Sequence, residues 1–132
     1  MADNASATGE PAELTERVRL ALESGDLNAI TDLLDPAARW GAPDGPYEAD
    51  CQNRDQVLAW WASARATGAR AVVTEVTAGP GTLLVGLEVT GTPAARGVAE
   101  RWQVLTVRDD RIVDIRGFDD RAAAASRAGV PA

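Results

Sequence analysis

The chain contains no histidine and no lysine, and its only cysteine is Cys51. Without lysine there is no amine for a Schiff base, and without histidine there is no imidazole to act as a base or to bind a metal. A lone cysteine excludes an internal disulfide and supplies too few ligands for a zinc site. The sequence also lacks a glycine-rich phosphate motif, so we expect no metal and no cofactor. Acid–base chemistry would have to come from aspartate, glutamate, Tyr47 or Cys51.

The sequence also lacks an excess of positive charge and a long hydrophobic run. Its 20 acidic residues against 13 basic ones give a net charge of −7, which argues against nucleic acid and anionic membranes as partners. No apolar stretch approaches the roughly 18 residues of a membrane span. The first residues have neither the basic start nor the apolar segment of a signal peptide, so the expected location is cytoplasmic. A length of 132 residues suits one domain.

The hydrophobic spacing predicts helices first and strands second. Apolar residues at helical intervals predict two helices before residue 36, the second capped by Asp26. Asn53 with Gln56 resembles a capping box and predicts a third helix, which Gly68 closes. A short strand at 37–42 and four long strands are predicted at 70–78, 82–90, 98–108 and 111–118. This order is typical of an α+β domain over 11–127, between a disordered tail at 1–10 and a short tail at 128–132.

Residues 98–118 predict a β-hairpin with Asp109 and Asp110 as its turn. Regular pairing places Leu105 opposite Asp114, and side chains alternate between the two faces. One face then carries Arg101, Gln103, Leu105, Asp114, Arg116 and Phe118. The other carries Glu100, Trp102, Val104, Thr106, Val113, Ile115 and Gly117. We expect the second face to be buried because it is the more apolar, although a register slip of one residue would exchange the faces.

The pattern resembles the nuclear transport factor two-like superfamily, and most closely its SnoaL-like domains. The motifs that carry the resemblance are Ser24-Gly25-Asp26-Leu27, Trp40-x-x-Pro43, the capped helix after Asn53, the turn from Arg108 to Val113, and Gly117-Phe118-Asp119. The resemblance covers about residues 11–127. It implies a cone-shaped, curved antiparallel sheet that is closed by N-terminal helices around an internal pocket. It also implies a hydrophobic small molecule as ligand and a homodimer through the outer sheet face.

The same resemblance places the tryptophan-bearing hairpin face on the concave side of the sheet. The predicted ligand-pocket residues are Trp40, Trp61, Leu83, Val85, Leu87, Trp102, Val104, Ile115 and Gly117. The known catalytic sets of the family do not transfer to this chain. Positions used by the isomerase branch correspond to Val18, Ala42 and Trp102, and the cyclase branch uses a histidine. The epoxide hydrolase branch uses an Arg-x-Asp pair where this chain has Glu100-x-Trp102.

The sequence offers three catalytic candidates. Asp119 ends the last predicted strand on the pocket face and could move a proton. Alternatively, Asp119 or Asp120 could cap the helix that follows. Glu100 is predicted beside Trp102, where its burial would cost several kcal/mol unless it lies at the rim. Tyr47 could donate a hydrogen bond to a substrate carbonyl. For Cys51 an inert thiol is the expectation, and the pair Asp114 and Arg116 is expected on the surface or at the rim of a dimer interface.

Three functions remain open on this basis. The first is a metal-free enzyme acting on a hydrophobic small molecule, by isomerisation, cyclisation, dehydration or epoxide opening. The second is a non-catalytic protein that binds such a molecule in the same pocket. The third is a dimerisation module whose core is filled. A wide, tryptophan-lined cavity that contains an ionisable group would favour the first function, and a core plugged by Trp102 and Leu87 would favour the third.

Overall fold

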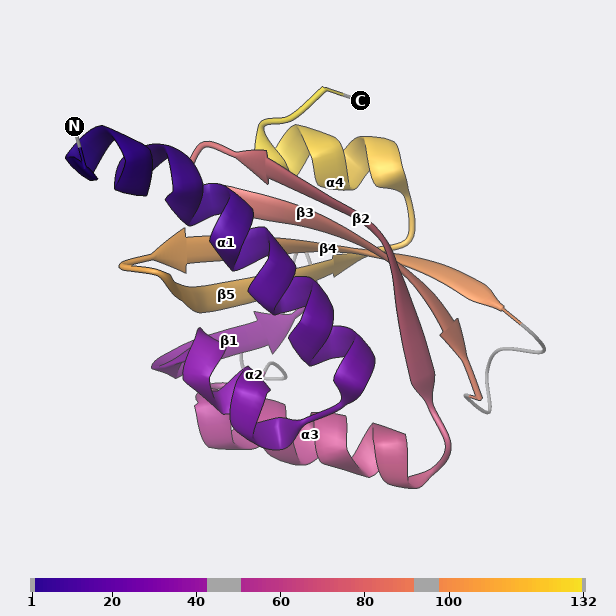
Figure 1. The fold of residues 1–132 in the computed structure, drawn as a ribbon. Helices are drawn as coiled ribbons and strands as arrows, with labels where there is room; N and C mark the ends of the chain where they lie inside the picture. The colour runs from indigo at the N-terminus through magenta and orange to yellow at the C-terminus, as the bar shows by residue number, and fades with distance from the viewer. Residues whose placement is uncertain (1, 43–50, 92–97, 132) are drawn as a thin grey trace.

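The computed structural model describes residues 2–42, 51–91 and 98–131, with side chains from residue 13 onward. Helices mostly precede strands, as predicted for an α+β domain (Figure 1). The elements are α1 (Ala2–Ser24), α2 (Leu27–Leu33), β1 (Leu34–Gly41), α3 (Arg54–Ala66), β2 (Arg70–Gly79), β3 (Thr82–Thr90), β4 (Ala99–Arg108), β5 (Arg111–Phe118) and α4 (Arg121–Ala128). The four long strands coincide with their predicted ranges to within one residue at each end.

The described strands form one twisted five-stranded sheet in the order β1-β5-β4-β3-β2 (Figure 1). Neighbours from β2 to β5 are antiparallel, whereas β1 is parallel to β5. The sheet is therefore mixed, and the prediction of a wholly antiparallel sheet is corrected at this edge. The reason lies in the connection: α3 and the meander β2–β4 intervene before β5 pairs with β1, so no hairpin imposes an antiparallel pairing.

Side-chain caps begin three of the helices. The Asp26 carboxylate accepts a hydrogen bond from the backbone N–H two residues on (2.9 Å) and begins α2. The Asn53 side chain accepts from the N–H of Gln56 at 3.0 Å, and the Gln56 side chain accepts from the N–H of Gln52 at 2.7 Å. Asp120 caps α4 by accepting from the N–H three residues on, at 3.0 Å. The predicted caps Asp26 and Asn53 are confirmed.

The first helix starts earlier than the sequence indicated. It runs from Ala2, whereas we predicted a disordered tail at 1–10 and a helix beginning near Pro11. Alanine at several early positions favours helix. The prediction gave more weight to the polar composition of the segment. The described core contacts of α1 begin at Leu14. The division of the chain into a domain at 11–127 with short tails stays a prediction.

Two hydrophobic clusters lie on opposite faces of the sheet. On the inner face, α1, α2 and α3 cover a large cluster that includes Val18, Ile30, Leu83, Val85, Leu105 and Ile115. On the outer face, α4 covers a smaller cluster: Leu84 and Val104 pack with Ala124, Ala125 and Ala128, and Trp102 and Phe118 border it. The predicted inward placement of Leu83, Val85 and Leu87 is confirmed, because all three belong to the inner cluster.

The hairpin β4–β5 contains a bulge that changes which residues share a face. Asp109 and Asp110 form the predicted turn, with φ angles of 53° and 63°, and Arg108 pairs with Arg111. Val107 still pairs with Ile112, but Thr106 pairs with Asp114, so Val113 is the extra residue. From there on, the predicted pairing is displaced by one residue.

The displacement corrects the two predicted faces. Leu105 pairs with Ile115 and Gln103 with Gly117, and this inner face continues to Arg101 and Asp119. Trp102 and Val104, which we predicted on the inner face, lie on the outer face with Arg116 and Phe118. The alternation within β4 was predicted correctly, but one unpaired residue of β5 reversed the assignment of β4 to the two faces.

The helix α4 is held on the outer face by an ion pair and a ring contact. The Arg121 guanidinium donates to both carboxylate oxygens of Glu75, at 2.9 and 2.7 Å. It also lies over the Trp102 ring, 5.8 Å from the ring centroid. The hydrogen bonds from Arg121, helped by one from Thr77, keep the pKa of Glu75 below its ordinary value against an opposing effect of burial. Glu75, whose register the sequence left open, is thus assigned to the outer face.

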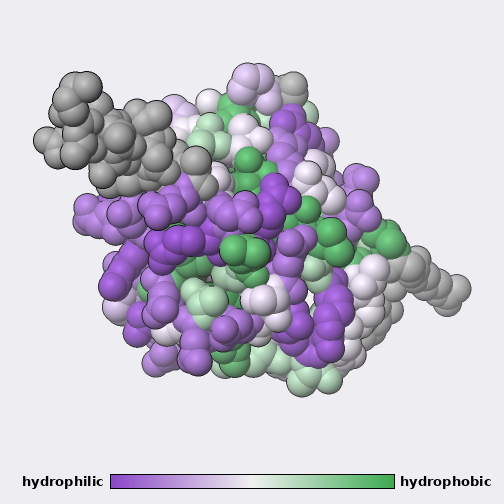
Figure 2. Space-filling model, viewed as in Figure 1, coloured by the Kyte–Doolittle hydropathy of each residue, from purple (hydrophilic) through white to green (hydrophobic). Residues whose placement is uncertain are grey.

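The surface over α1 and α2 is mostly hydrophilic, with hydrophobic residues scattered among polar ones (Figure 2). Large hydrophobic side chains are exposed at Leu20, Leu27, Trp60, Val72 and Val98. Two of them, Trp60 and Val98, border the same cavity, which is described below. In the described ranges no helix is both long enough and apolar enough to cross a bilayer.

Candidate ligand-binding cavity

A wide cavity of about 840 Å³ opens between α3, β1 and the inner face of the sheet. It lies on the inner face of the sheet, and we call it the outer cavity because it is open to solvent. Its described lining comes from Trp40–Ala42, Cys51, Trp60–Arg65, Ala69–Ala71, β3, β4 and the end of β5. Trp40 and Trp60 meet edge to face, with ring centroids 4.4 Å apart. The volume lies within the range of about 300–1,000 Å³ that is usual for small-molecule sites.

A second, smaller space of about 70 Å³ lies among α1, α2, β1, α3 and the sheet. We call it the inner cavity. Both cavities are lined by Trp40, Trp61, Ala71, Leu87 and Gln103, so these residues form the neck between them. The inner cavity is otherwise lined by aliphatic residues such as Val18, Leu33 and Ile115. The inner cavity is lined mainly by apolar residues, and the outer cavity has a more polar lining.

Charged groups lie at the outer end of this hollow. Arg101 on β4 forms an ion pair with Asp119, which follows β5, and both residues line the outer cavity. The Asp119 side chain is 85% exposed and that of Arg101 54%. The alternative role for Asp119, capping α4, is wrong, because Asp120 provides that cap. Asp119 therefore borders the outer cavity and does not cap α4.

Glu100 does not join this site. It is exposed, its Cα lies opposite that of Glu88 on β3, and it alternates with Arg101 on the strand. Trp102 borders the outer cavity, but its ring packs against Gly86 and Arg121 on the α4 side. Val104 is buried under α4, away from both cavities. The bulge at Val113 is the physical reason for all three corrections.

The other predicted lining residues are placed as follows. Trp40, Trp61 and Leu87 form part of the neck, Ile115 lines the inner cavity, and Gly117 lines the outer one. Leu83 and Val85 lie on the same face but are packed into the core, outside the described lining of either cavity.

Two further expectations concern the loop before α3, with Tyr47 as a hydrogen-bond donor and Cys51 as an inert thiol. Tyr47 lies outside the described residues. Cys51 lines the outer cavity, and its backbone exchanges two hydrogen bonds with that of Trp40, at 3.1 and 2.8 Å. Within the described ranges, no three histidine, cysteine, aspartate or glutamate side chains gather closely enough to hold a metal ion.

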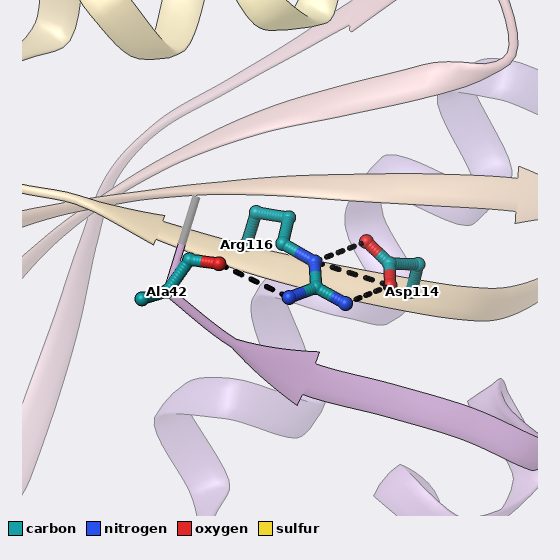
Figure 3. Close-up of polar contacts among 3 residues, drawn as sticks. All are labelled: Ala42, Asp114 and Arg116. Carbon is teal, nitrogen blue, oxygen red and sulfur yellow. Dashed lines mark hydrogen bonds and ion pairs between the residues drawn. The ribbon is translucent and has the colours of Figure 1, made fainter. Parts of the chain in front are cut away.

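In the pair Asp114 and Arg116 the arginine side chain is buried and the aspartate side chain is 25% exposed. The Arg116 side chain is 4% exposed and donates to the Asp114 carboxylate, with the shortest contact at 2.8 Å. Its remaining terminal nitrogen donates to the carbonyl oxygen of Ala42 at 3.0 Å (Figure 3). The prediction of a surface ion pair is therefore wrong. Arg116 instead ties β5 to Ala42, which follows β1 and itself lines the outer cavity.

Sequence reasoning missed Gln103 and Arg101 as cavity residues. Both were assigned to the outer face by the regular register. The signal that could have found them is the spacing of Ile112 and Ile115, which are both buried in the inner cluster. Two residues three apart cannot share a face of a regular strand, so their joint burial requires a bulge between them.

Comparisons with known proteins agree with this fold. A search of curated protein sequences finds no match. Among solved structures, a Sinorhizobium meliloti protein proposed to be a polyketide cyclase is 23% identical, with 80% of this chain and 94% of that chain covered and a TM-score of 0.65. A Kribbella flavida protein proposed to be a ketosteroid isomerase is 16% identical, with 83% and 76% covered and a TM-score of 0.68.

An NTF2-like protein of unknown function from Cytophaga hutchinsonii is 10% identical, with 85% and 91% covered and a TM-score of 0.63. At these identities the structures share the fold with this chain and show nothing more. The SnoaL-like domain family matches residues 15–115, which is most of the sequence. The chain therefore belongs to the SnoaL-like domain family and has the NTF2-like fold.

Proposed function

We propose that this protein binds a hydrophobic small molecule in the joined inner and outer cavities and acts on it by moving a proton. The observation that carries the proposal is a tryptophan-bordered hollow of ligand size with one carboxylate, Asp119, among its described lining. Indole rings favour flat apolar partners by stacking. The names of the structural relatives, a polyketide cyclase and a ketosteroid isomerase, support a small organic substrate.

Asp119 is the proposed proton acceptor. Its contact with Arg101 holds the carboxylate at the cavity edge, where a substrate carbon acid or hydroxyl could reach it. The Arg101 guanidinium would in turn stabilise negative charge that develops on the substrate. Isomerisation, cyclisation, dehydration and epoxide opening all begin with such a transfer or with charge stabilisation of this kind. Tyr47 remains a proposed hydrogen-bond donor.

A second candidate is a binding protein without catalysis. The high exposure of Asp119 favours it, because a carboxylate surrounded by water is a weaker base catalyst than a desolvated one. In either case we expect the partner to be a small molecule, the compartment to be the cytoplasm and the assembly to be a homodimer through the outer sheet face. Light scattering tests the assembly, and a monomer at high concentration would contradict it.

The catalytic proposal is tested by carboxylate-to-amide substitution. Purified protein is assayed with a β,γ-unsaturated cyclic ketone, followed by the absorbance of the conjugated product, and with styrene oxide, followed by chromatography. Asp119→Asn is expected to lower kcat by about 100-fold or more. Glu100→Gln, the same change on the outer face, is the matched control and should leave kcat unchanged. Saturable binding without turnover of either substrate would favour the non-catalytic candidate.

A further inference from the structure

Gln103 is chemically the odd member of the neck. The other neck residues are Trp40, Trp61, Ala71 and Leu87, and among the described lining of the inner cavity Gln103 alone carries an amide side chain. That amide makes no hydrogen bond with any residue that the structure describes. A half-buried amide without a partner carries a desolvation cost unless water or a ligand satisfies it. The neck therefore presents an amide donor and acceptor that no described residue occupies.

The space beside this amide is open because of its cross-strand neighbour. Gln103 pairs with Gly117 on β5, on the same face of the sheet. A Cβ added to Gly117 would meet no atom within 4 Å, so the missing side chain leaves a gap next to the amide. On its other side Gln103 pairs with Val85, which is completely buried. The amide therefore has the buried Val85 on one side and open space towards Gly117 on the other.

We propose that Gln103 is the specificity-determining residue of the cavity and that the ligand carries one uncharged oxygen, a ketone or a hydroxyl, which lies over Gly117. The amide N–H₂ would donate to a ketone oxygen, and the amide oxygen would accept from a hydroxyl. This oxygen sits between two apolar parts of the ligand. A small apolar group enters the inner cavity, and a flat part lies against Trp40 and Trp61 in the neck. The inference rests on the proposed function and names the class of ligand for the same site.

The proposal is tested with two probes of the same shape. Acetophenone carries the ketone oxygen, and α-methylstyrene has a methylene group in its place. Their dissociation constants are measured by titration of backbone amide resonances in the full chain. Wild type should bind the ketone about fivefold more tightly than the hydrocarbon, which corresponds to one neutral hydrogen bond. Gln103→Leu should abolish or reverse that preference.

Two further variants separate a loss of ligand recognition from a loss of folding. Gly117→Val fills the gap beside the amide and should weaken ketone binding, while its melting temperature shows that the domain is intact. Thr106→Val removes a hydroxyl from the same strand on the outer face and should leave the preference unchanged. If both probes bind in the cavity with the same ratio in wild type and Gln103→Leu, the role of Gln103 is refuted and the binding function survives. If neither probe perturbs cavity residues, the proposed function itself fails.

Discussion

The contact between Gly86 on β3 and Trp102 on β4 provides a quantitative test of which face the indole occupies. A Cβ at position 86 would lie 2.5 Å from Cζ3 of Trp102 and 2.7 Å from Oγ1 of Thr74, whereas ordinary contact begins at 3.4 Å. The ring would have to move by roughly 1 Å, and overpacking of this kind costs about 1–3 kcal/mol. Replacing glycine within a strand returns about 0.5–1 kcal/mol. We therefore expect Gly86→Ala to destabilise the domain by about 1–2 kcal/mol.

The assay is a double-mutant cycle in urea or by thermal melting. Trp102→Leu removes the indole, so most of the Gly86→Ala cost should disappear in the double variant, a coupling of about 1 kcal/mol or more. Gly117→Ala is the matched control, because no atom lies within 4 Å of its added Cβ. It should be neutral or slightly stabilising. A Gly86→Ala cost that is absent, or that persists unchanged without the indole, would refute the placement of Trp102 under α4.

Three further predictions concern the polar contacts of the outer face and the buried ion pair. Asp120→Ala should cost about 1 kcal/mol through loss of the α4 cap, whereas Asp119→Ala should cost much less; thermal melts followed by circular dichroism compare them. The folded-state pKa of Glu75 is lowered from 4.5. Its ion pair with Arg121 should therefore add up to about 1 kcal/mol to the free energy of unfolding above pH 4.5, and this contribution should be lost on acidification. The stability difference between wild type and Glu75→Gln should therefore shrink as pH falls below 4.5, and a difference that grows would reverse the sign of the argument. Arg116→Met should cost about 3–5 kcal/mol in urea, because it leaves the Asp114 charge without its buried partner; a cost below 1 kcal/mol would show that the pair is solvated.

Local sequence signals predicted the elements well because they act over a few residues. The caps at Asp26 and Asn53 depend on one side chain and one nearby N–H. The turn at Asp109 and Asp110 depends on two residues that tolerate positive φ. Such features do not require knowledge of the partner element. The same holds for the four long strands, whose ranges follow from composition and turn residues.

The assignment of faces failed because it depends on pairing between strands. One unpaired residue at Val113 placed Gln103 rather than Trp102 on the inner face of the sheet, although both strands were located correctly. The parallel pairing of β1 with β5 is likewise a long-range choice that local patterns do not encode. The candidate site was therefore predicted at Ile115 and Gly117 of β5 and at Asp119 after it, and missed at Arg101 and Gln103 of β4.

The central claim is that the neck between the two cavities admits a ligand. Ala71 lies in that neck, so Ala71→Trp should fill it with an indole. Ala122→Trp, at an exposed position of α4, adds the same group far from the neck and serves as control. The most direct measurement is the dissociation constant of acetophenone for the three proteins. We expect Ala71→Trp to weaken binding at least about tenfold, a loss of about 1.4 kcal/mol, while Ala122→Trp binds like wild type. Equal affinity in all three proteins, with Ala71→Trp still folded, would contradict the account.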